Sequence, residues 1–304
     1  MTVIGQVLRP FTWDDVRTYA RLLNETGAAE GAGTQLTDQE AAEHLRQPNL
    51  SPLRDCVIAE VDGLPAGFSL TVPELLIGRT IVEGTVHPAY RRKGLGRKLL
   101  DNAVEHSRAL KARVVHASAS PDAEALLRLL ETSGFTKRQR QVQMRLKVDD
   151  LKPGEPGSGY EVRPLAEGEA NIFSRIQNLA FDGSWGFAPN TPQELDYRLH
   201  MIGASYSDVL LLFVDGQPAA YCWTRMQRVG PERRGIIWMI GADPAFRGQG
   251  LGRAMLLQSI SLMLTRGASA FELTVYADNA PAVKLYESVG FTWKEDILWY
   301  ELEL

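Results

Sequence analysis

Short apolar runs alternate along the chain with stretches in which apolar residues recur every three or four positions, and this order occurs twice. In each half a short run ending in Arg-Pro precedes a helical pattern, near 13–23 and near 168–180. After a loop, a second helical pattern opens at Thr37 or Thr191. A glutamate three residues after each threonine completes a capping box, which predicts the start of a helix.

Two apolar runs joined by Asp-Gly follow in each half, and this dipeptide between apolar runs predicts a β-hairpin. Next come a strand, a glycine-rich loop, a helix, a strand, a helix and a last strand. The hairpin and last-strand runs are 56–61, 66–72 and 142–148 in the first half, and 209–214, 219–225 and 297–304 in the second. We therefore expect an α/β protein made of two tandem copies, each a mixed, mostly antiparallel sheet with helices on both faces.

The spacing between matching residues identifies a duplication. Gly94 and Gly250 lie 156 residues apart, and the Arg-Pro pairs at Arg9 and Arg163 lie 154 apart. This period is too long for a solenoid repeat, so it indicates a duplicated domain. The stretch between the copies is rich in Pro and Gly, as linkers are. The expected organisation is a domain at 1–148, a linker at 149–159 and a domain at 160–304.

The loop between a strand and a helix carries the first candidate chemistry. Residues 247–252 read Arg-Gly-Gln-Gly-Leu-Gly, after the apolar run 236–240 and before a helical pattern at 251–264. Glycines allow a ligand to approach the main chain, and the start of a helix presents free N–H groups and the positive end of its dipole. This arrangement predicts a pyrophosphate site. The first half repeats it at 91–96, as Arg-Arg-Lys-Gly-Leu-Gly.

Composition narrows the class of protein. The chain has 304 residues, 44% hydrophobic and 23% charged, with a net charge of −4. These values are typical of a soluble globular protein and argue against a nucleic-acid binder. No apolar run approaches the length of a membrane span, and the first ten residues lack a signal-peptide pattern, so we expect a cytoplasmic protein. Cys56 and Cys222 are expected to be free buried thiols, and neither lies in a pattern typical of a metal site.

Two motifs together resemble the GNAT superfamily of N-acetyltransferases. One is the glycine loop after a strand, and the other is the later run Asn279-x-x-Ala-x-x-Leu-Tyr286-x-x-x-Gly290-Phe291. The resemblance covers both halves, as in fused two-domain members. It implies acetyl-CoA as donor and CoA as product, with pantetheine along the strand at 240–242 and pyrophosphate on the loop.

The cofactor contacts that the resemblance implies form two sets, one in each half. They are Ile240, Gly241, Ala242, Arg247, Gly248, Gln249, Gly250, Leu251, Gly252, Arg253 and Asn279 in the second half, and Val86, Arg91, Arg92, Gly94, Leu95, Gly96 and Arg97 in the first. The basic run of the first half is expected to neutralise phosphates, so that half could hold acetyl-CoA without turning it over. The alternative is a spent domain kept for its core.

The repeat also indicates which half is catalytic. The departing thiolate needs a proton, which a tyrosine hydroxyl can supply and a leucine cannot. The family resemblance assigns this acid role to Tyr286. Subtracting 156 puts Leu130 at the matching position, and Ala123 at the position of Asn279. The first half is therefore expected to be catalytically degenerate. Asn279 is also expected to cap the helix that it opens.

The acceptor site is predicted in the loop at 181–191, which is aromatic in the second half and made of small residues in the first. Trp185 and Phe187 are the candidate walls, and Asp182 is the candidate partner of an ammonium group. The alternative is a lid that packs on its own core.

The general base is left open. A two-domain member of the family carries a glutamate eight residues before the proline that matches Pro244, and Ile236 stands there in this chain. A water relay, Asp182 or Glu272 could serve instead. In the first half Glu83 lies in the corresponding strand.

These features predict an N-acetyltransferase that moves acetyl from acetyl-CoA to a primary amine, by direct attack in one ternary complex. A small-molecule acceptor is favoured because the loop is compact and aromatic. Two alternatives remain: a non-catalytic acetyl-CoA-binding or scaffold protein, and a protein N-acetyltransferase. No partner other than the acceptor amine is expected, and the oligomeric state is left open.

Overall fold

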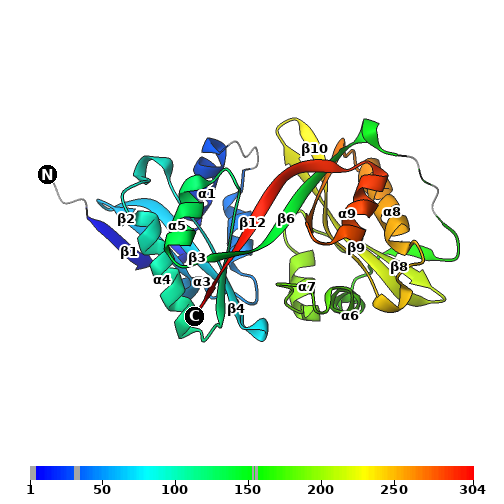
Figure 1. The fold of residues 1–304 in the computed structure, drawn as a ribbon, viewed down its shortest axis with the longest axis horizontal. Coiled ribbons are helices and arrows are strands. Elements are labelled where there is room, and N and C mark those ends of the chain that lie inside the picture. The colour runs from blue at the N-terminus through cyan, green and yellow to red at the C-terminus, as the bar shows by residue number, and fades with distance from the viewer. Residues whose placement is uncertain (1–4, 31–34, 153, 155–156) are drawn as a thin grey trace. The chain divides into compact units, whose positions relative to one another are not determined.

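The computed structural model describes residues 5–30, 35–152, 154 and 157–304. The chain divides into two compact units, one made of Met1–Gln139 with Leu298–Leu304 and the other of Arg140–Ile297. Figure 1 shows the elements of both, coloured along the chain.

The first unit contains a sheet in the strand order β1-β2-β3-β4-β5-β12, in which only the described pair β4 and β5 is parallel. Its strands are β1 (Gln6–Pro10), β2 (Cys56–Val61), β3 (Leu64–Glu74), β4 (Arg79–Val86), β5 (Val114–Ala119) and the end of β12 (Thr292–Glu303). Its helices are α1 (Val16–Ala29), α2 (Asp38–Leu45), α3 (Pro52–Asp55), α4 (Leu95–Ala109) and α5 (Glu124–Thr132). α1 and α2 pack through Leu22 and Leu45 on Phe68 of one face, whereas α4 packs through Leu99 on Ala66 of the other.

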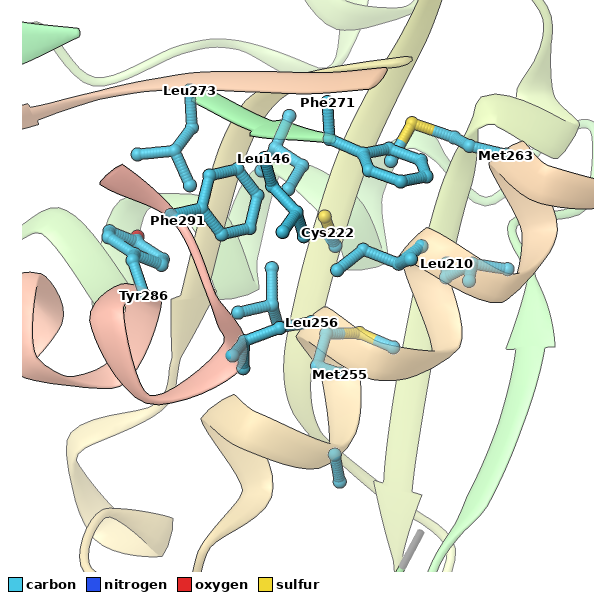
Figure 2. Close-up of a cluster of buried hydrophobic side chains, with 14 of the residues drawn as sticks. Leu146, Leu210, Cys222, Met255, Leu256, Met263, Phe271, Leu273, Tyr286 and Phe291 are labelled. Carbon is cyan, nitrogen blue, oxygen red and sulfur yellow. The ribbon is translucent and has the colours of Figure 1, made fainter. Parts of the chain in front are cut away.

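The second unit repeats this architecture in the strand order β7-β8-β9-β10-β11-β6. Its strands are β7 (Glu161–Pro164), β8 (Val209–Val214), β9 (Gln217–Val229), β10 (Glu232–Ala242), β11 (Ala270–Tyr276) and most of β6 (Thr136–Lys147). Its helices are α6 (Ala170–Phe181), α7 (Pro192–Leu199), α8 (Leu251–Thr265) and α9 (Ala280–Val289). α6 and α7 pack around Tyr221 on one face, and α8 and α9 pack around Cys222 on the other, where Figure 2 shows the core.

The predicted fold class is confirmed in both units. Each sheet is mixed and mostly antiparallel, with helices on both faces. The Asp-Gly turns at Asp62 and Asp215 have positive φ at both central residues, which is the geometry that suits the twist of a hairpin. The capping boxes at Thr37 and Thr191 are also present.

The pattern predicts that the last strand of each half completes the sheet of its own half, but each pairs with a strand from the other half of the sequence. The strand that ends the first half pairs through Gln141–Lys147 with β11 of the second unit. The strand that ends the chain pairs through Leu298–Glu303 with β5 of the first unit. The two repeats have similar strand patterns here, so a hydrophobic pattern identifies a strand without identifying which copy it joins. The last strands are therefore exchanged.

The repeated Arg-Pro pairs have a structural explanation. Arg9 binds the carboxylate of Asp15 with two hydrogen bonds of 2.7 Å, and Arg163 binds Glu169 at 2.7 and 2.8 Å. These hydrogen bonds lower the pKa of both carboxyl groups. Each carboxylate stands near the start of the first helix of its unit, so the arginine fixes the helix to the first strand.

Candidate active site

The glycine loop of the second unit forms an open cradle at the start of α8. Gly248 and Gly250 have φ of 81° and 78°, which favours glycine. Within the described part of the chain, no backbone N–H from Gly248 to Gly252 donates a hydrogen bond. A Cβ added at Gly250 would meet no atom within 4 Å. The loop therefore offers free donors, open space and a helix dipole to an anion, as a pyrophosphate requires.

The loop of the first unit has the same conformation. Gly94 has φ of 82°, and Arg92 has φ of 63° at the position that matches Gly248. An arginine in the left-handed region is strained, so the loop keeps its shape at a cost in energy. Arg91 donates to the carbonyl of Val86 at 2.9 Å and to Glu30 at 2.7 Å. The Arg91 side chain thus connects the end of β4 to Glu30.

The arginines that flank the loop of the second unit tie neighbouring helices to it. Arg247 donates to the carbonyl of Ala180 at the end of α6, at 2.9 Å. Arg253 donates to the Ser288 hydroxyl of α9 at 2.6 Å, as Arg97 does to Ser133 in the first unit at 2.7 Å. Both arginines have a structural role beside the phosphate contact that the sequence predicts.

The two parallel strands next to the loop separate part-way along their length. β10 pairs with β11 only from Arg234 to Ile237, although it continues along β9 as far as Ala242. β11 likewise continues along β6 after Leu273. Past Ile237 the edge of β10 that faces β11 therefore has backbone groups that pair with no strand among the described residues. An extended amide chain can pair with such an edge.

Tyr286 lies on α9 on the same face of the sheet as the residues that line this opening. It is 6% exposed and belongs to the hydrophobic cluster against which Ile240 and Ala242 pack (Figure 2). Burial, with a smaller effect of Cys222, raises the pKa of the Tyr286 phenol above its usual value. Its hydroxyl therefore stays protonated at neutral pH. In the first unit Leu130 takes its place and is 1% exposed.

The capping role of Asn279 is confirmed. Its side-chain oxygen accepts a hydrogen bond from the N–H of Ala282 at 3.3 Å. Ala123, at the matching position of the first unit, makes no side-chain cap.

A comparison with protein families identifies this arrangement. The model of the acetyltransferase (GNAT) family matches the chain twice, over residues 21–135 and 173–291. The chain belongs to the GNAT family. It is therefore an acetyl-CoA-dependent N-acetyltransferase by family, with one GNAT region in each half.

Several curated relatives of this GNAT protein are mycothiol acetyltransferases. The protein from Amycolatopsis mediterranei is 28% identical over 301 residues, which cover 94% of each chain. The protein from Thermomonospora curvata is 30% identical over 239 residues, which cover 76% of each chain.

Solved structures show the same fold over the whole length. A GCN5-related N-acetyltransferase from Sphaerobacter thermophilus is 22% identical, with a TM-score of 0.76, covering 98% of this chain and 95% of that chain. A tandem GNAT protein from the clavulanic acid biosynthesis pathway is 18% identical, with a TM-score of 0.76 and 98% of each chain covered.

The aromatic loop between α6 and α7 packs largely on the unit's own aromatic residues. Trp185 meets Tyr276 edge to face at 6.0 Å, and its carbonyl accepts a hydrogen bond from the Tyr276 hydroxyl at 3.1 Å. Phe187 stacks on Phe181 at 5.3 Å. Asp182 is exposed at the end of α6. The three predicted acceptor residues thus come from one loop, and of these three only the aspartate is exposed.

The carboxylates that could act as a base differ in their freedom. Glu272 is 5% exposed, and its Oε1 lies 3.2 Å from Arg234 and 3.4 Å from Lys294. It is therefore engaged in ion pairs beside Ile236, its neighbour across the two strands. Glu83 is exposed in the first unit.

Sequence reasoning missed two buried polar residues on the α6 side of β10. The fully buried Gln177 donates to the sulfur of Met239 at 3.1 Å and accepts from Asn190 at 2.8 Å. The Tyr221 hydroxyl is buried close to the Gln177 amide, but within the described residues no hydrogen bond of good geometry satisfies it. Tyr221 pairs across the strands with Gly241.

The repeat contained a signal for this pair. Asn24 and Asn178 have the same structural role. The side-chain oxygen of each accepts a hydrogen bond from a loop N–H, at 2.8 Å for Asn24 and 3.0 Å for Asn178. The residue before them is Leu23 in the first unit and Gln177 in the second. Phe68 likewise occupies the place of Tyr221. Two apolar positions of the first unit are thus polar in the second.

The remaining expectations concern thiols, metals and membranes. Cys56 and Cys222 are free and buried, as predicted, and burial raises the pKa of each thiol to about 12. In the described ranges, no three His, Cys, Asp or Glu side chains lie close enough to hold a metal ion. None of the helices searched there is both long and apolar enough to cross a membrane.

Proposed function

We propose that the second repeat, residues 160–304, transfers acetyl from acetyl-CoA to a primary amine of a small molecule. The observation that carries this proposal is the juxtaposition in one unit of three features. These are the anion cradle at Gly248–Gly252, the open edge of β10 after Ile237, and the buried phenol of Tyr286 on the same face. The first repeat, residues 1–148, has the first two features but a leucine in place of the phenol.

The residues divide the work of holding the donor. The N–H groups of Gly248–Gly252, with Arg247 and Arg253 nearby, would neutralise the pyrophosphate. The open edge at Ile240–Ala242 would pair with the pantetheine amides, and an N–H there would polarise the acetyl carbonyl. Asn279 would add a contact from the start of α9. Acetyl-CoA supplies the acetyl group as a thioester.

The transfer needs one proton to arrive and one to leave. The neutral amine forms the new C–N bond as the C–S bond breaks, and the departing sulfur takes the proton of the Tyr286 hydroxyl. The nitrogen loses a proton to water, from which the tyrosine is reprotonated. The phenol is neutral at physiological pH and therefore carries the proton that the thiolate takes, while burial raises its pKa and makes it a weaker acid. No covalent bond to the protein is required.

Water is the base that we favour. Ile236 has no proton-accepting group, and Glu272 is engaged with Arg234 and Lys294. Asp182 is exposed and could pair with the ammonium form of the acceptor before it is deprotonated. This arrangement would make the rate depend strongly on the fraction of acceptor that is neutral.

The proposed acceptor class rests on the loop and on the relatives. A compact loop that packs on Tyr276 and Phe181 suits a small ligand better than a peptide groove. The relatives named mycothiol acetyltransferase support a small-molecule amine.

The absence of a glutamate at Ile236 favours one competing function. A protein that binds acetyl-CoA without turning it over would need the loops and no base. It would also have no use for Tyr286, which distinguishes the two functions.

CoA release from acetyl-CoA should be measured with D-glucosamine, L-lysine, spermidine and a peptide with a free N-terminus. The wild type should transfer acetyl to at least one of the small amines. Tyr286→Phe should lower kcat about a hundredfold and leave the Kd of acetyl-CoA unchanged, because only the acid is removed. Tyr160→Phe, which removes another buried hydroxyl from the same unit, should keep the wild-type rate.

Equal rates in Tyr286→Phe and the wild type would refute the acid assignment. Binding of acetyl-CoA without release by any amine would favour the non-catalytic function, and preference for the peptide would favour a protein N-acetyltransferase.

A further inference from the structure

Trp238 is an extra residue in the strand that borders the proposed site. Ile237 pairs with Thr224, and Met239 pairs with the next residue, Trp223. Trp238 between them has no partner on β9, so it forms a β-bulge. A bulge bends its strand and re-aims side chains, and bulges are common beside active sites.

The bulge is present in the second unit alone among the described cofactor strands. β4 pairs with β3 from Gly67 to Glu74 without a shift in register. The numbering agrees: Pro244 follows Pro88 by 156 residues, whereas Arg234 follows Arg79 by only 155. One residue has therefore been inserted between the start of β10 and its glycine loop.

The inserted side chain lies on the α6 face, opposite the cluster that holds Tyr286. Its ring packs at 4.8 Å on Trp223, which in turn meets Phe173 of α6 edge to face. The guanidinium of Arg225 lies 5.6 Å from the centre of the Trp238 ring. Trp238 is nevertheless 48% exposed. One side of the indole thus packs on Trp223, and the rest of its surface is open. This open surface lies on the side from which an acceptor would approach the opening of β10.

This position distinguishes Trp238 from the aromatic residues that the sequence singled out. Trp185 and Phe187 already pack on Tyr276 and Phe181. Trp238 lies one residue past the last β10 residue that pairs with β11. The neighbouring polar group is the Arg225 guanidinium.

We propose that Trp238 is a specificity-determining residue. Its open indole face stacks on the ring of an acceptor whose amine is attached to a six-membered ring. The inference rests on the proposed function. A flat apolar surface beside a guanidinium suits a saturated six-membered ring, with apolar C–H groups on its face and hydroxyl groups at its edge. A linear amine can cover little of that surface, so the indole discriminates between the two.

The test compares D-glucosamine, an amino sugar with a six-membered ring, with glucamine, an open-chain amino alcohol that also has six carbons. Kinetics are measured for the wild type, Trp238→Ala and Trp238→Phe, with the Kd of acetyl-CoA determined by calorimetry. Trp238→Ala should raise KM for glucosamine about tenfold. The KM for glucamine, kcat for both amines and the Kd of acetyl-CoA should stay within about twofold, because the ring contact alone is lost. Trp238→Phe should keep the KM for glucosamine close to the wild-type value, because its ring can still stack.

Trp293→Ala is the matched control, since Trp293 is a 63% exposed tryptophan of the same unit. It should leave all constants unchanged. An equal change for both amines, or none, would overturn the role of Trp238 while the proposed function stands. Transfer to glucamine or lysine but not to glucosamine would refute the proposal that the acceptor contains a ring. Binding of acetyl-CoA with no transfer to any amine would overturn the proposed function as well.

Discussion

The Tyr221 hydroxyl belongs to a small group of buried polar atoms that the core of the second unit does not satisfy. Burial is the main cause that raises the pKa of this phenol well above its usual value, and the nearby Gln177 amide offsets part of it, so the group is neutral. A buried hydroxyl without a hydrogen bond destabilises the folded state by about 1–3 kcal/mol. Phe68 fills the same place in the first unit without that cost. The second unit therefore retains a polar group that its own stability does not require.

Tyr221→Phe is accordingly expected to stabilise the protein. The free energy of unfolding should rise by about 1 kcal/mol, which corresponds to an increase in Tm of roughly 2–4 °C. Calorimetry measures the change directly. Tyr206→Phe is the control, because the Tyr206 hydroxyl donates to Asp196 and its loss should lower Tm. A fall in Tm for both variants would contradict this account of Tyr221.

Single residues could be predicted where a motif surrounds them. Asn279 caps the helix that it opens, and Tyr286 lies on this helix, as the motif predicts. Trp238 could not be found in this way, because an inserted residue breaks the alignment of the two halves and has no counterpart. Gln177 was missed for a different reason: its polarity has meaning only once α6 is seen to lie over Met239.

At the scale of elements, the sequence predicted helix caps and turns correctly, but it did not predict which strands pair. The capping boxes and Asp-Gly turns occur where the sequence predicts them. α1 runs to Ala29, six residues beyond the predicted helix, since the alanines of that segment favour a helix. Residues 31–34, in the loop expected between this helix and the next, lie outside the described residues. The exchange of the last strands could not be predicted, because nothing local distinguishes the two partners.

The exchange predicts which unit depends on the end of the chain. Deleting Leu298–Leu304 removes the strand that pairs with β5, so the first unit should lose stability although the cut lies in the second half of the sequence. Hydrogen exchange should accelerate at Val114–Ala119. Ala270–Tyr276 should stay protected, because Gln141–Lys147 still pairs with it. The opposite pattern, with β11 exposed and β5 protected, would show that the strands are not exchanged.

At the scale of the whole molecule, duplication has left two units with one cofactor-loop conformation and different surroundings. Each loop has two left-handed residues, Arg92 and Gly94 in one and Gly248 and Gly250 in the other, and the N–H groups of 92–96 and 248–252 donate no hydrogen bond within the described residues. The bulge, the phenol and the buried polar pair occur in the second unit, where the first has a regular strand, a leucine and two apolar residues. Under the proposed function, these differences concern the reaction rather than the fold. They are the reason to assign turnover to one unit and to treat the other as its degenerate copy.

The most direct test of this assignment is the rate of amine-dependent CoA release in two matched variants, Gly250→Glu and Gly94→Glu. Both glycines have φ near 80° and open space around the added side chain, so the structural cost is the same, and each glutamate repels a pyrophosphate from its own loop. We predict that Gly250→Glu lowers the rate at least about a hundredfold and that Gly94→Glu keeps it within about twofold of the wild type. A loss of activity in Gly94→Glu with Gly250→Glu still active would contradict the account.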